Sequence, residues 1–547
     1  MQASRRQEGS RKKSSNRAQN STPIRNTATR LGICFAVAQA SACDFHISNR
    51  YTKLLENRVS YTKQTTAPHS NRYKKALLAT CSFRLFSLYF SSRIRRVSSL
   101  PATRRAPRTS SGLTLAFLPW YLRRHRGVDM RRILPGLTIA LCAMVFPACA
   151  FAQQKPIVIA ASTVLDGRGH ILHDTRIVIE NSKIVRIDPN ASPVTYDLRG
   201  LTVLPGWIDC HVHITYHFGP NGRAEDKDET PEQSALAIES NAWLTLMGGF
   251  TTVQSVGSPE DKPLRDMINR RAIPGPRILT AFRPLFGRGD ATGTPEQIRA
   301  YIDKVAANGA DLIKIFASKS IRDGGGPTLS QEQLSAACSE AKKYGLRTLV
   351  HAYRDSVRMA TLAGCTEVEH GTFATDDDLR LMAQHGAYFD PQVGLVIQNY
   401  LDNENRYLGI GNYTESGFAQ MKQALPLDAD LFRRALKTPG LKIVFGTDAV
   451  AGADGRNAEE LIDRVRDGGQ DPMAAMVSAN SLAAESMNLQ DEIGSIAPGL
   501  QADIIALDGD PLDDITAVRR VAFVMKGGMV YKNVARAHIP QYAGVTP

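Results

Sequence analysis

The sequence predicts an α/β protein built on a (β/α)8 TIM-type barrel, with a small β-sandwich assembled from both ends of the mature chain. Two observations support this fold class. Between residues 206 and 493, short apolar runs alternate with amphipathic helical stretches, which is typical of a barrel of parallel strands. Short segments with Val and Ile at alternating positions flank this region, at 155–205 and 494–535, and such segments indicate strands.

The barrel region contains eight strand candidates, and helical stretches such as 295–308, 331–344 and 376–385 lie between them. Eight strands that are each followed by a helix favour a closed barrel over an open sheet. The strand candidates are residues 207–214, 251–256, 277–280, 312–316, 348–351, 367–370, 387–390 and 442–446.

Strand candidates outside the barrel occur in two groups. The first group includes 176–180 and 183–187, and the sequence Glu180-Asn181-Ser182-Lys183 between them predicts a hairpin turn. The second group, near the C-terminus, includes 502–507 and 521–525. Because the two groups flank a long barrel, we expect them to form one β domain together.

The charge is distributed unevenly along the chain. Residues 1–129 contain 25 Lys and Arg against 4 Asp and Glu, a net of +21, whereas the rest contains 42 against 49, a net of −7. The overall charge of +14 therefore describes the leader, and we expect no nucleic-acid partner for the barrel. The leader itself is interpreted as disordered, or as translated upstream sequence that is not part of the working protein.

A secretory signal is predicted at residues 130–152. Met130 precedes two arginines, an apolar run over 133–146, and the small-x-small site Ala150-Phe151-Ala152. We therefore expect translation to start at Met130, cleavage after Ala152, and a periplasmic or secreted enzyme without a membrane span after signal removal. An uncleaved anchor and a lipoprotein through Cys149 are alternatives, although the residues before Cys149 fit a lipobox poorly.

Cysteine usage argues against a cysteine-based scaffold. Five of the eight cysteines precede residue 153, which leaves Cys210, Cys338 and Cys365, widely spaced and without a CxxC motif. We expect neither a disulfide framework nor a structural zinc knuckle.

Chemistry-bearing residues stand at the ends of several predicted barrel strands, where the active sites of such barrels are built. The pair His211 and His213 has a spacing that points both imidazoles to one face of a strand. Each residue alone is explained by an ordinary hydrogen-bonded polar side chain at a strand end. Six of them on one rim favour a metal-dependent catalytic site. The candidate ligands are His211, His213, Lys314, His351, His370 and Asp448.

This order of residues resembles the amidohydrolase superfamily, and in particular its imidazolonepropionase-like and Xaa-Pro-dipeptidase-like branch. Matching segments include 204–209, 249–253 and 494–503, so the resemblance covers roughly residues 156–535. The chain departs from the family where Gln254-Ser255 replaces a frequent Arg-Asp, and where residues 480–484 read Asn-Ser-Leu-Ala-Ala. Neither departure affects the candidate ligands.

The resemblance implies two divalent metal ions, with Zn2+ expected and Mn2+ or Co2+ as substitutes. His211, His213 and Asp448 would hold one metal and His351 and His370 the other. Lys314, carboxylated by CO2, would bridge them as a carbamate. Two cations acidify a water shared between them, and Asp448 would accept its proton and pass it to the leaving amine.

The substrate is less strongly indicated. Arg283, Arg288, Arg322 and Tyr353 lie near the expected barrel mouth and could bind a substrate carboxylate. Tyr353 is preferred, because in similar dipeptidases the Tyr of a His-x-Tyr sequence meets the substrate carboxylate. The leading hypothesis is a hydrolase of dipeptides or N-acyl amino acids, with a homo-oligomer left open. The alternatives are hydrolysis of a cyclic amide, a lactone or another ester at the same site, and an inactive barrel that serves as an interaction scaffold.

Overall fold

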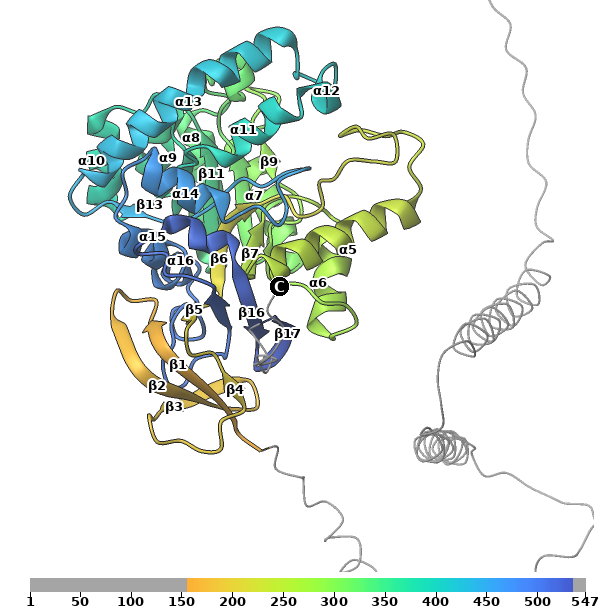
Figure 1. Ribbon diagram of the computed structural model, residues 1–547. Helices are drawn as coiled ribbons and strands as arrows, with labels where there is room; N and C mark the ends of the chain where they lie inside the picture. The colour runs from red at the N-terminus through yellow and green to blue at the C-terminus, as the bar shows by residue number, and fades with distance from the viewer. Residues whose placement is uncertain (1–154, 535–547) are drawn as a thin grey trace, which may run out of the picture. The chain divides into compact units, whose positions relative to one another are not determined.

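The computed structural model describes residues 155–534, which form an α/β structure with one mixed sheet and two all-parallel sheets (Figure 1). The expected leader at 1–129 and signal segment at 130–152 lie outside the described residues. None of the helices within 155–534 is long and apolar enough to cross a membrane.

The mixed sheet joins both ends of the described chain. Its strands are hydrogen-bonded in the order β17-β16-β15-β5-β1-β2-β3, and β4 pairs with β1. Strands β5 and β15 pair antiparallel in the middle, so residues about 300 positions apart lie side by side (Figure 1). The strands are β1 Ile157–Leu165, β2 Ile171–Glu180, β3 Lys183–Ile187, β4 Tyr196–Asp197, β5 Thr202–Pro205, β15 Ile504–Leu507, β16 Val521–Lys526 and β17 Met529–Asn533.

The two parallel sheets carry the middle of the chain. One sheet has the order β6-β7-β8 and the other β14-β13-β12-β11-β10-β9. The predicted bounds of β8, β10 and β12 are confirmed, and β9 was not predicted. The strands are β6 Trp207–Val212, β7 Phe250–Ser255, β8 Arg277–Thr280, β9 Leu285–Phe286, β10 Leu312–Phe316, β11 Arg347–Ala352, β12 Glu367–His370, β13 Tyr388–Asp390 and β14 Lys442–Ile443.

Backbone hydrogen bonds connect the two parallel sheets at both edges. At one edge, the amide of Asp311, just before β10, donates to the carbonyl of Thr280 in β8 at 2.9 Å. At the other edge, Cys210 in β6 donates to Phe445 at 2.9 Å, and His213 donates to Ala449 at 2.8 Å. These bonds bring the segment after β14 beside β6.

Helices follow the parallel strands and lie outside them (Figure 1). Several begin at a Ser or Thr whose hydroxyl caps the first turn, as Thr294 and Ser330 do for α7 and α8, because those side chains satisfy free backbone amides. The helices are α5 Pro231–Met247, α6 Asp261–Asn269, α7 Pro295–Ala307, α8 Gln331–Lys343, α9 Asp355–Leu362, α10 Asp376–His385, α11 Leu395–Asp402, α12 Glu404–Tyr407, α13 Glu415–Leu436, α14 Glu459–Arg466, α15 Pro472–Ser478 and α16 Ser481–Ser486, with 3-10 turns η3 Ile321–Asp323 and η4 Ile515–Arg519.

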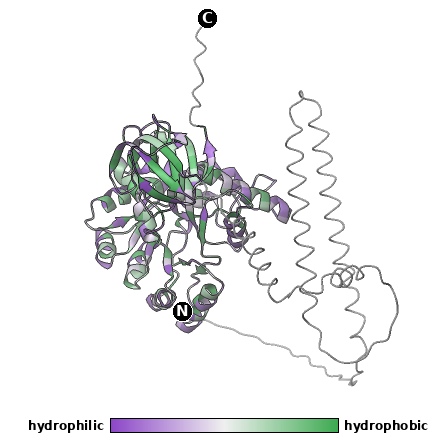
Figure 2. Ribbon diagram, turned by 90° about the horizontal axis from the view of Figure 1, so that it is seen from below, coloured by the Kyte–Doolittle hydropathy of each residue, from purple (hydrophilic) through white to green (hydrophobic). Residues whose placement is uncertain are grey.

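Hydrophobic residues concentrate on the strands, whereas the helices mix hydrophobic and hydrophilic residues (Figure 2). One core cluster joins the mixed sheet to the parallel strands: Leu204 and Ile505 pack with Trp207 of β6 and Phe250 of β7. All four are fully buried. This contact holds the N-terminal end of β6 against the mixed sheet, and the opposite end of β6 carries the first candidate ligands.

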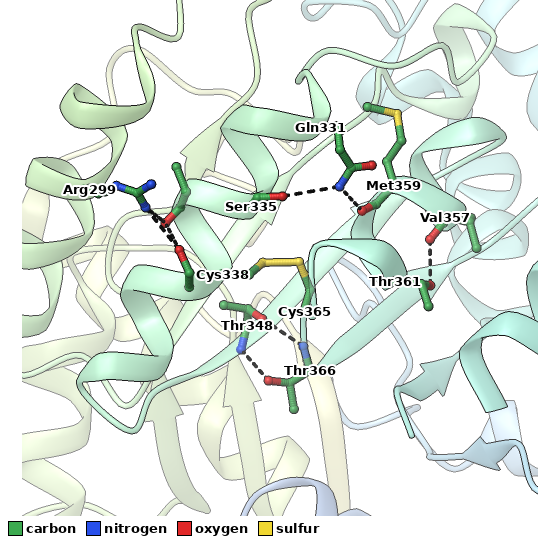
Figure 3. Close-up of a disulfide and its surroundings, with 12 residues drawn as sticks. Arg299, Gln331, Ser335, Cys338, Thr348, Val357, Met359, Thr361, Cys365 and Thr366 are labelled. Carbon is green, nitrogen blue, oxygen red and sulfur yellow. Dashed lines mark hydrogen bonds between the residues drawn. A yellow bond between two sulfur atoms is a disulfide. The ribbon is translucent and has the colours of Figure 1, made fainter. Parts of the chain in front are cut away.

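A disulfide joins Cys338 in α8 to Cys365, just before β12 (Figure 3). No disulfide framework was expected from the sequence, so this pair was not predicted. Although 27 residues separate the two cysteines, their Cα atoms lie 5.2 Å apart, because α8 packs against α9 and β11, and Cys365 follows shortly after α9. Reciprocal hydrogen bonds between Thr348 and Thr366, at 3.2 and 2.9 Å, fix the same strand start.

Candidate active site

The side chains of His211 and His213 converge on Asp448 at the C-terminal end of β6. Both Nε2 atoms lie 3.2 Å from Oδ1 of Asp448. Asp448 has a left-handed backbone with φ 51°, and its amide donates to the carbonyl of His211 at 2.7 Å. Because that conformation is unfavourable for a residue with a Cβ, the surrounding contacts must hold it in place.

His351 in β11 and His370 at the end of β12 add two more imidazoles. Their ring centroids lie 4.6 Å apart, and the ring of His370 lies 5.5 Å from that of His211. Neighbouring parallel strands end on the same side of a sheet. As a result, four imidazoles from three strands meet at one end of the parallel sheets.

Lys314 of β10 completes the group of six predicted residues. Its side chain is fully buried, and its Nζ lies 3.4 Å from Nε2 of His211. The ammonium also donates to Oε2 of Glu369. Glu369 is a residue that sequence reasoning missed, and its other oxygen, Oε1, lies 3.4 Å from Nδ1 of His211.

Burial controls the charge of these groups. It lowers the pKa of His351 to about 3, and it also lowers the pKa values of His211 and His370, so these imidazoles are neutral at pH 7. Burial lowers the pKa of Lys314 to about 7 against the opposing effect of nearby carboxylates. Burial alone would raise the pKa of Asp448, but its hydrogen bond with His213 and its electrostatic interactions with His213, His370 and Lys314 bring that pKa below its usual value.

The donor set suits divalent metal ions. Neutral imidazoles offer lone pairs and an ionised Asp448 offers charge, a combination typical of zinc and similar cations. Ligand atoms of His211, His213 and Asp448 lie within 4.8 Å of one another, and so do those of His211, Glu369 and His370. Oε1 of Glu369 is buried and has no hydrogen-bond partner among the described residues. The residues present therefore fit a metal centre.

Two buried acids outside the predicted set position the segments that carry the ligands. Asp209 accepts hydrogen bonds from the amide of His211 at 3.1 Å and from the hydroxyl of Thr447 at 2.7 Å. It thus connects β6 to the segment that presents Asp448. Asp390, at the end of β13, lies 3.4 Å from the fully buried guanidinium of Arg464 and 3.9 Å from Nδ1 of His211.

A cavity of 480 Å³ opens above the candidate ligands. Five of the six predicted ligands line it; Lys314 is the exception and lies beneath the surface. The upper wall comes from η3, α11 and α13, from β9, and from the segments that follow β6, β11, β12 and β13. Its residues include Tyr216, Phe286, Arg322, Tyr353, Thr372, Gln392, Tyr400, Tyr413, Met421 and Asp428.

Only two of the four predicted substrate-binding residues line this cavity. The ring of Tyr353 stacks on that of His370 at 5.2 Å. The guanidinium of Arg322 lies 3.9 Å above the ring of Tyr413. Arg283 and Arg288 instead line a separate surface depression with Pro284 and Tyr301, and are absent from the lining of the catalytic cavity.

Several known proteins are similar to this chain. The ochratoxinase of Aspergillus niger is 25% identical over 493 residues, which cover 80% of this chain and 96% of that protein. Among solved structures, a Xaa-Pro dipeptidase with bound methionine in the active site aligns with a TM-score of 0.63 at 29% identity, covering 69% of this chain and 100% of its own. A prolidase complexed with N-methylphosphonate-L-proline aligns with a TM-score of 0.61 at 25% identity and the same coverage.

Buried imidazoles, a lysine and a carboxylate gather at one end of the parallel strands, an arrangement that suits a hydrolase with an α/β fold and a metal centre. The model of the amidohydrolase family matches residues 202–531, a range that contains every candidate ligand. The chain belongs to the amidohydrolase family, and it is a hydrolase that acts on carbon–nitrogen bonds.

Proposed function

We propose that this protein is an exported, binuclear metal-dependent hydrolase that cleaves the amide bond of dipeptides or N-acyl amino acids. The observation that carries the proposal is the convergence of all six predicted ligands beneath one cavity whose wall offers a phenol and a guanidinium. The similar ochratoxinase, Xaa-Pro dipeptidase and prolidase support an amide substrate.

His211, His213 and Asp448 would hold one metal, and His351 and His370 the other, with Lys314 between them. When bound, the metals supply Lewis-acid polarisation of the scissile carbonyl and a more acidic water. Asp448 is ionised and faces both His211 and His213, so it can accept the proton of the attacking water. It then returns that proton to the leaving amine, which is the exchange a general base performs.

Lys314 is proposed to carry a CO2-derived carbamate in the active enzyme. In the uncarboxylated form, its ammonium is balanced by Glu369. Carboxylation replaces this cation with an anion beside the buried carboxylates Glu367, Glu369 and Asp390. Such a change is unfavourable without compensating positive charge. We therefore expect carboxylation of Lys314 and binding of the metals to occur together.

Tyr353 and Arg322 are the proposed contacts for a substrate carboxylate. The hydroxyl of Tyr353 has no hydrogen-bond partner among residues 155–534, and its ring lies against His351 and His370. Arg322 donates from Nε to Asn412 at 3.0 Å and forms no salt bridge with any carboxylate in the described part of the chain. A phenol without a hydrogen-bond partner and a guanidinium without a carboxylate partner, both in one cavity wall of the described chain, complement a carboxylate.

Two finer features belong to the same proposal. We infer that the parallel sheets close into one (β/α)8 barrel, supported by the hydrogen bonds that join them at both edges. Export is supported by the signal-like residues 130–152 and by the Cys338–Cys365 disulfide, because disulfides persist in oxidising compartments.

The decisive experiment combines elemental analysis with a substrate panel, using protein expressed from Met130. We expect two equivalents of a divalent metal, loss of activity on chelation, and hydrolysis of dipeptides or N-acyl amino acids. Preferred turnover of lactones or cyclic amides would replace the proposed substrate class with the alternative one. Inactivity of the metal-loaded protein on every member of the panel would favour the scaffold hypothesis.

A further inference from the structure

Asp428 is a carboxylate in the cavity wall that the proposed mechanism does not use. It lies in the middle of α13, the long helix over the cavity, and lines the cavity together with Thr372 and Tyr353. Only 5% of its surface is exposed. A carboxylate buried in a substrate cavity requires a reason, because removing it from water is unfavourable.

The protein satisfies only part of this carboxylate. The hydroxyl of Thr372 donates to Oδ1 of Asp428. No Lys, Arg or His among the described residues pairs with it, and no described donor contacts Oδ2. Burial raises the pKa of Asp428 to about 7. The described part of the chain therefore supplies no cation to balance the Asp428 carboxylate.

Asp428 lies close to the reaction centre. Its partner Thr372 is two residues beyond the candidate ligand His370, whose ring stacks on Tyr353 at 5.2 Å. The negative charge of Asp428 also acts on Tyr353, where it raises the pKa of the phenol in addition to the larger effect of burial. A cation that pairs with Asp428 therefore lies in the same cavity as the candidate ligands.

We propose that Asp428 binds the free α-ammonium group of the substrate and thereby selects dipeptides over N-acyl amino acids. This inference rests on the proposed amide hydrolase function. In a dipeptide, the α-ammonium is attached to the carbon next to the scissile carbonyl, whereas the cation of a Lys or Arg side chain is several bonds further away. Asp428 is hydrogen-bonded to Thr372, on the segment that carries the candidate ligand His370, so we assign it the α-ammonium, which is the cation nearer the scissile bond.

The cavity would then match both ends of a dipeptide zwitterion. Asp428 on α13 offers a negative charge, and Arg322 on η3 offers a positive one. Both side chains line the same cavity, yet no ion pair joins them. An anion and a cation that remain apart within one cavity are suited to a ligand that carries both charges.

The test compares two substrates that differ only in the ammonium group: alanyl-leucine and propionyl-leucine. The quantity measured is the ratio of their kcat/KM values in the metal-loaded enzyme, so that a loss of active protein cancels. A hydrogen bond to a charged group is worth about 10- to 150-fold. We expect the wild type to prefer alanyl-leucine by that order and Asp428→Asn to lose the preference.

The control variant is Asp430→Asn on the same helix. Asp430 is 58% exposed and pairs with Arg434, so its substitution should leave the ratio unchanged. If the wild type hydrolyses both substrates equally, or if Asp428→Asn keeps the preference, Asp428 does not read the ammonium. A preference for propionyl-lysine over propionyl-leucine that disappears in Asp428→Asn would assign Asp428 to a side-chain cation instead and would overturn the proposal.

These outcomes are distinguishable from failure of the proposed function itself. If neither substrate is hydrolysed while a lactone or cyclic amide is, the amide hydrolase proposal fails. If both are hydrolysed without discrimination, the amide hydrolase proposal stands and the role of Asp428 is wrong. Thr372→Val provides a second variant: it removes the hydroxyl donor but retains the carboxylate, so the preference for alanyl-leucine should survive.

Discussion

The candidate ligands and the wall of the cavity above them face the same space but come from different kinds of chain segment. Most candidate ligands stand in parallel strands or directly after them, where backbone pairing fixes their positions, and Asp448 is held beside the end of β6 by its backbone hydrogen bond to His211. The wall residues Arg322, Tyr400, Tyr413 and Asp428 come from a 3-10 turn, from helices α11 and α13, and from a loop. In barrel enzymes, the strand ends provide the chemistry, and variable connecting segments provide the specificity.

Substitutions of candidate ligands and substitutions of wall residues should affect activity in different ways. Substitution of a strand-borne residue should lower turnover of every substrate alike, because it damages the common reaction centre. Substitution of a wall residue should change the ratio between substrates instead, because it removes one contact with one substrate group.

The largest effect is expected for Lys314→Ala. The substitution removes the side chain that is proposed to bridge the two metals, so we expect loss of nearly all activity on every substrate and loss of most of the bridged metal. Elemental analysis and kinetic assays measure both quantities. Partial rescue by a small carboxylic acid is expected, because it can replace the missing carbamate. A variant that retains both metals and normal turnover would show that Lys314 is no ligand.

A second large effect at the reaction centre is expected for Asp448→Asn. The amide keeps the size and one oxygen but cannot accept a proton, so kcat should fall by roughly 10²- to 10⁴-fold on dipeptides and on N-acyl amino acids alike. Metal content must be measured in the same samples. Turnover within a few-fold of wild type with both metals bound would require another general base.

Much of the strand-borne region could be predicted from the sequence. The positions of β10 and β12, and the four candidate ligands that lie on β6, β10, β11 and β12, follow from short apolar runs that end in His or contain a Lys. Such signals are local, because a few consecutive residues are enough to recognise the alternation along a strand and the end of that strand.

Glu369 shows where this local reading fails. Strict alternation places Glu369 and His370 on opposite faces of β12, so a strand that points His370 into the site should point Glu369 away. Instead, His370 has a left-handed backbone with φ 65°, and Glu369 reaches Lys314 and His211. A backbone conformation of this kind depends on the surrounding fold and leaves no pattern in the sequence.

The wall was harder to predict, because its contacts join distant segments. Thr372 and Asp428 are 56 residues apart and meet only through the packing of α13 over the cavity. Arg283 and Arg288 show the converse case. Both lie in a loop that was predicted to border the cavity, yet both line a different depression. Position near a strand end therefore predicted which residues gather at the cavity floor better than which residues line its wall.

A wall effect of intermediate size is expected for Tyr353→Phe. A hydrogen bond to a charged group contributes about 1.5–3 kcal/mol, so the preference for substrates with a free carboxylate over their amide-capped analogues should fall roughly 10- to 150-fold. Arg283→Met serves as the matched control, because Arg283 lies outside the cavity lining. Equal losses on free and capped substrates would place Tyr353 with the common reaction centre and break the comparison.

The smallest effect on catalysis is expected for removal of the disulfide. Cys338 and Cys365 close a loop of 27 residues, and the chain-entropy model assigns such a loop about 3–4 kcal/mol of stability. The double variant Cys338→Ala/Cys365→Ala should therefore unfold at a lower denaturant concentration, as reduced wild type should in comparison with oxidised wild type. Neither cysteine lines the catalytic cavity, and β12 is also held by its pairing with β11 and β13. We thus expect kcat/KM under native conditions to change by less than about threefold on every substrate, because a protein that loses this much stability can still be almost entirely folded. A loss of tenfold or more in folded protein would show that the position of His370, five residues beyond Cys365, depends on the disulfide, and that the framework outside the cavity also controls the chemistry within it.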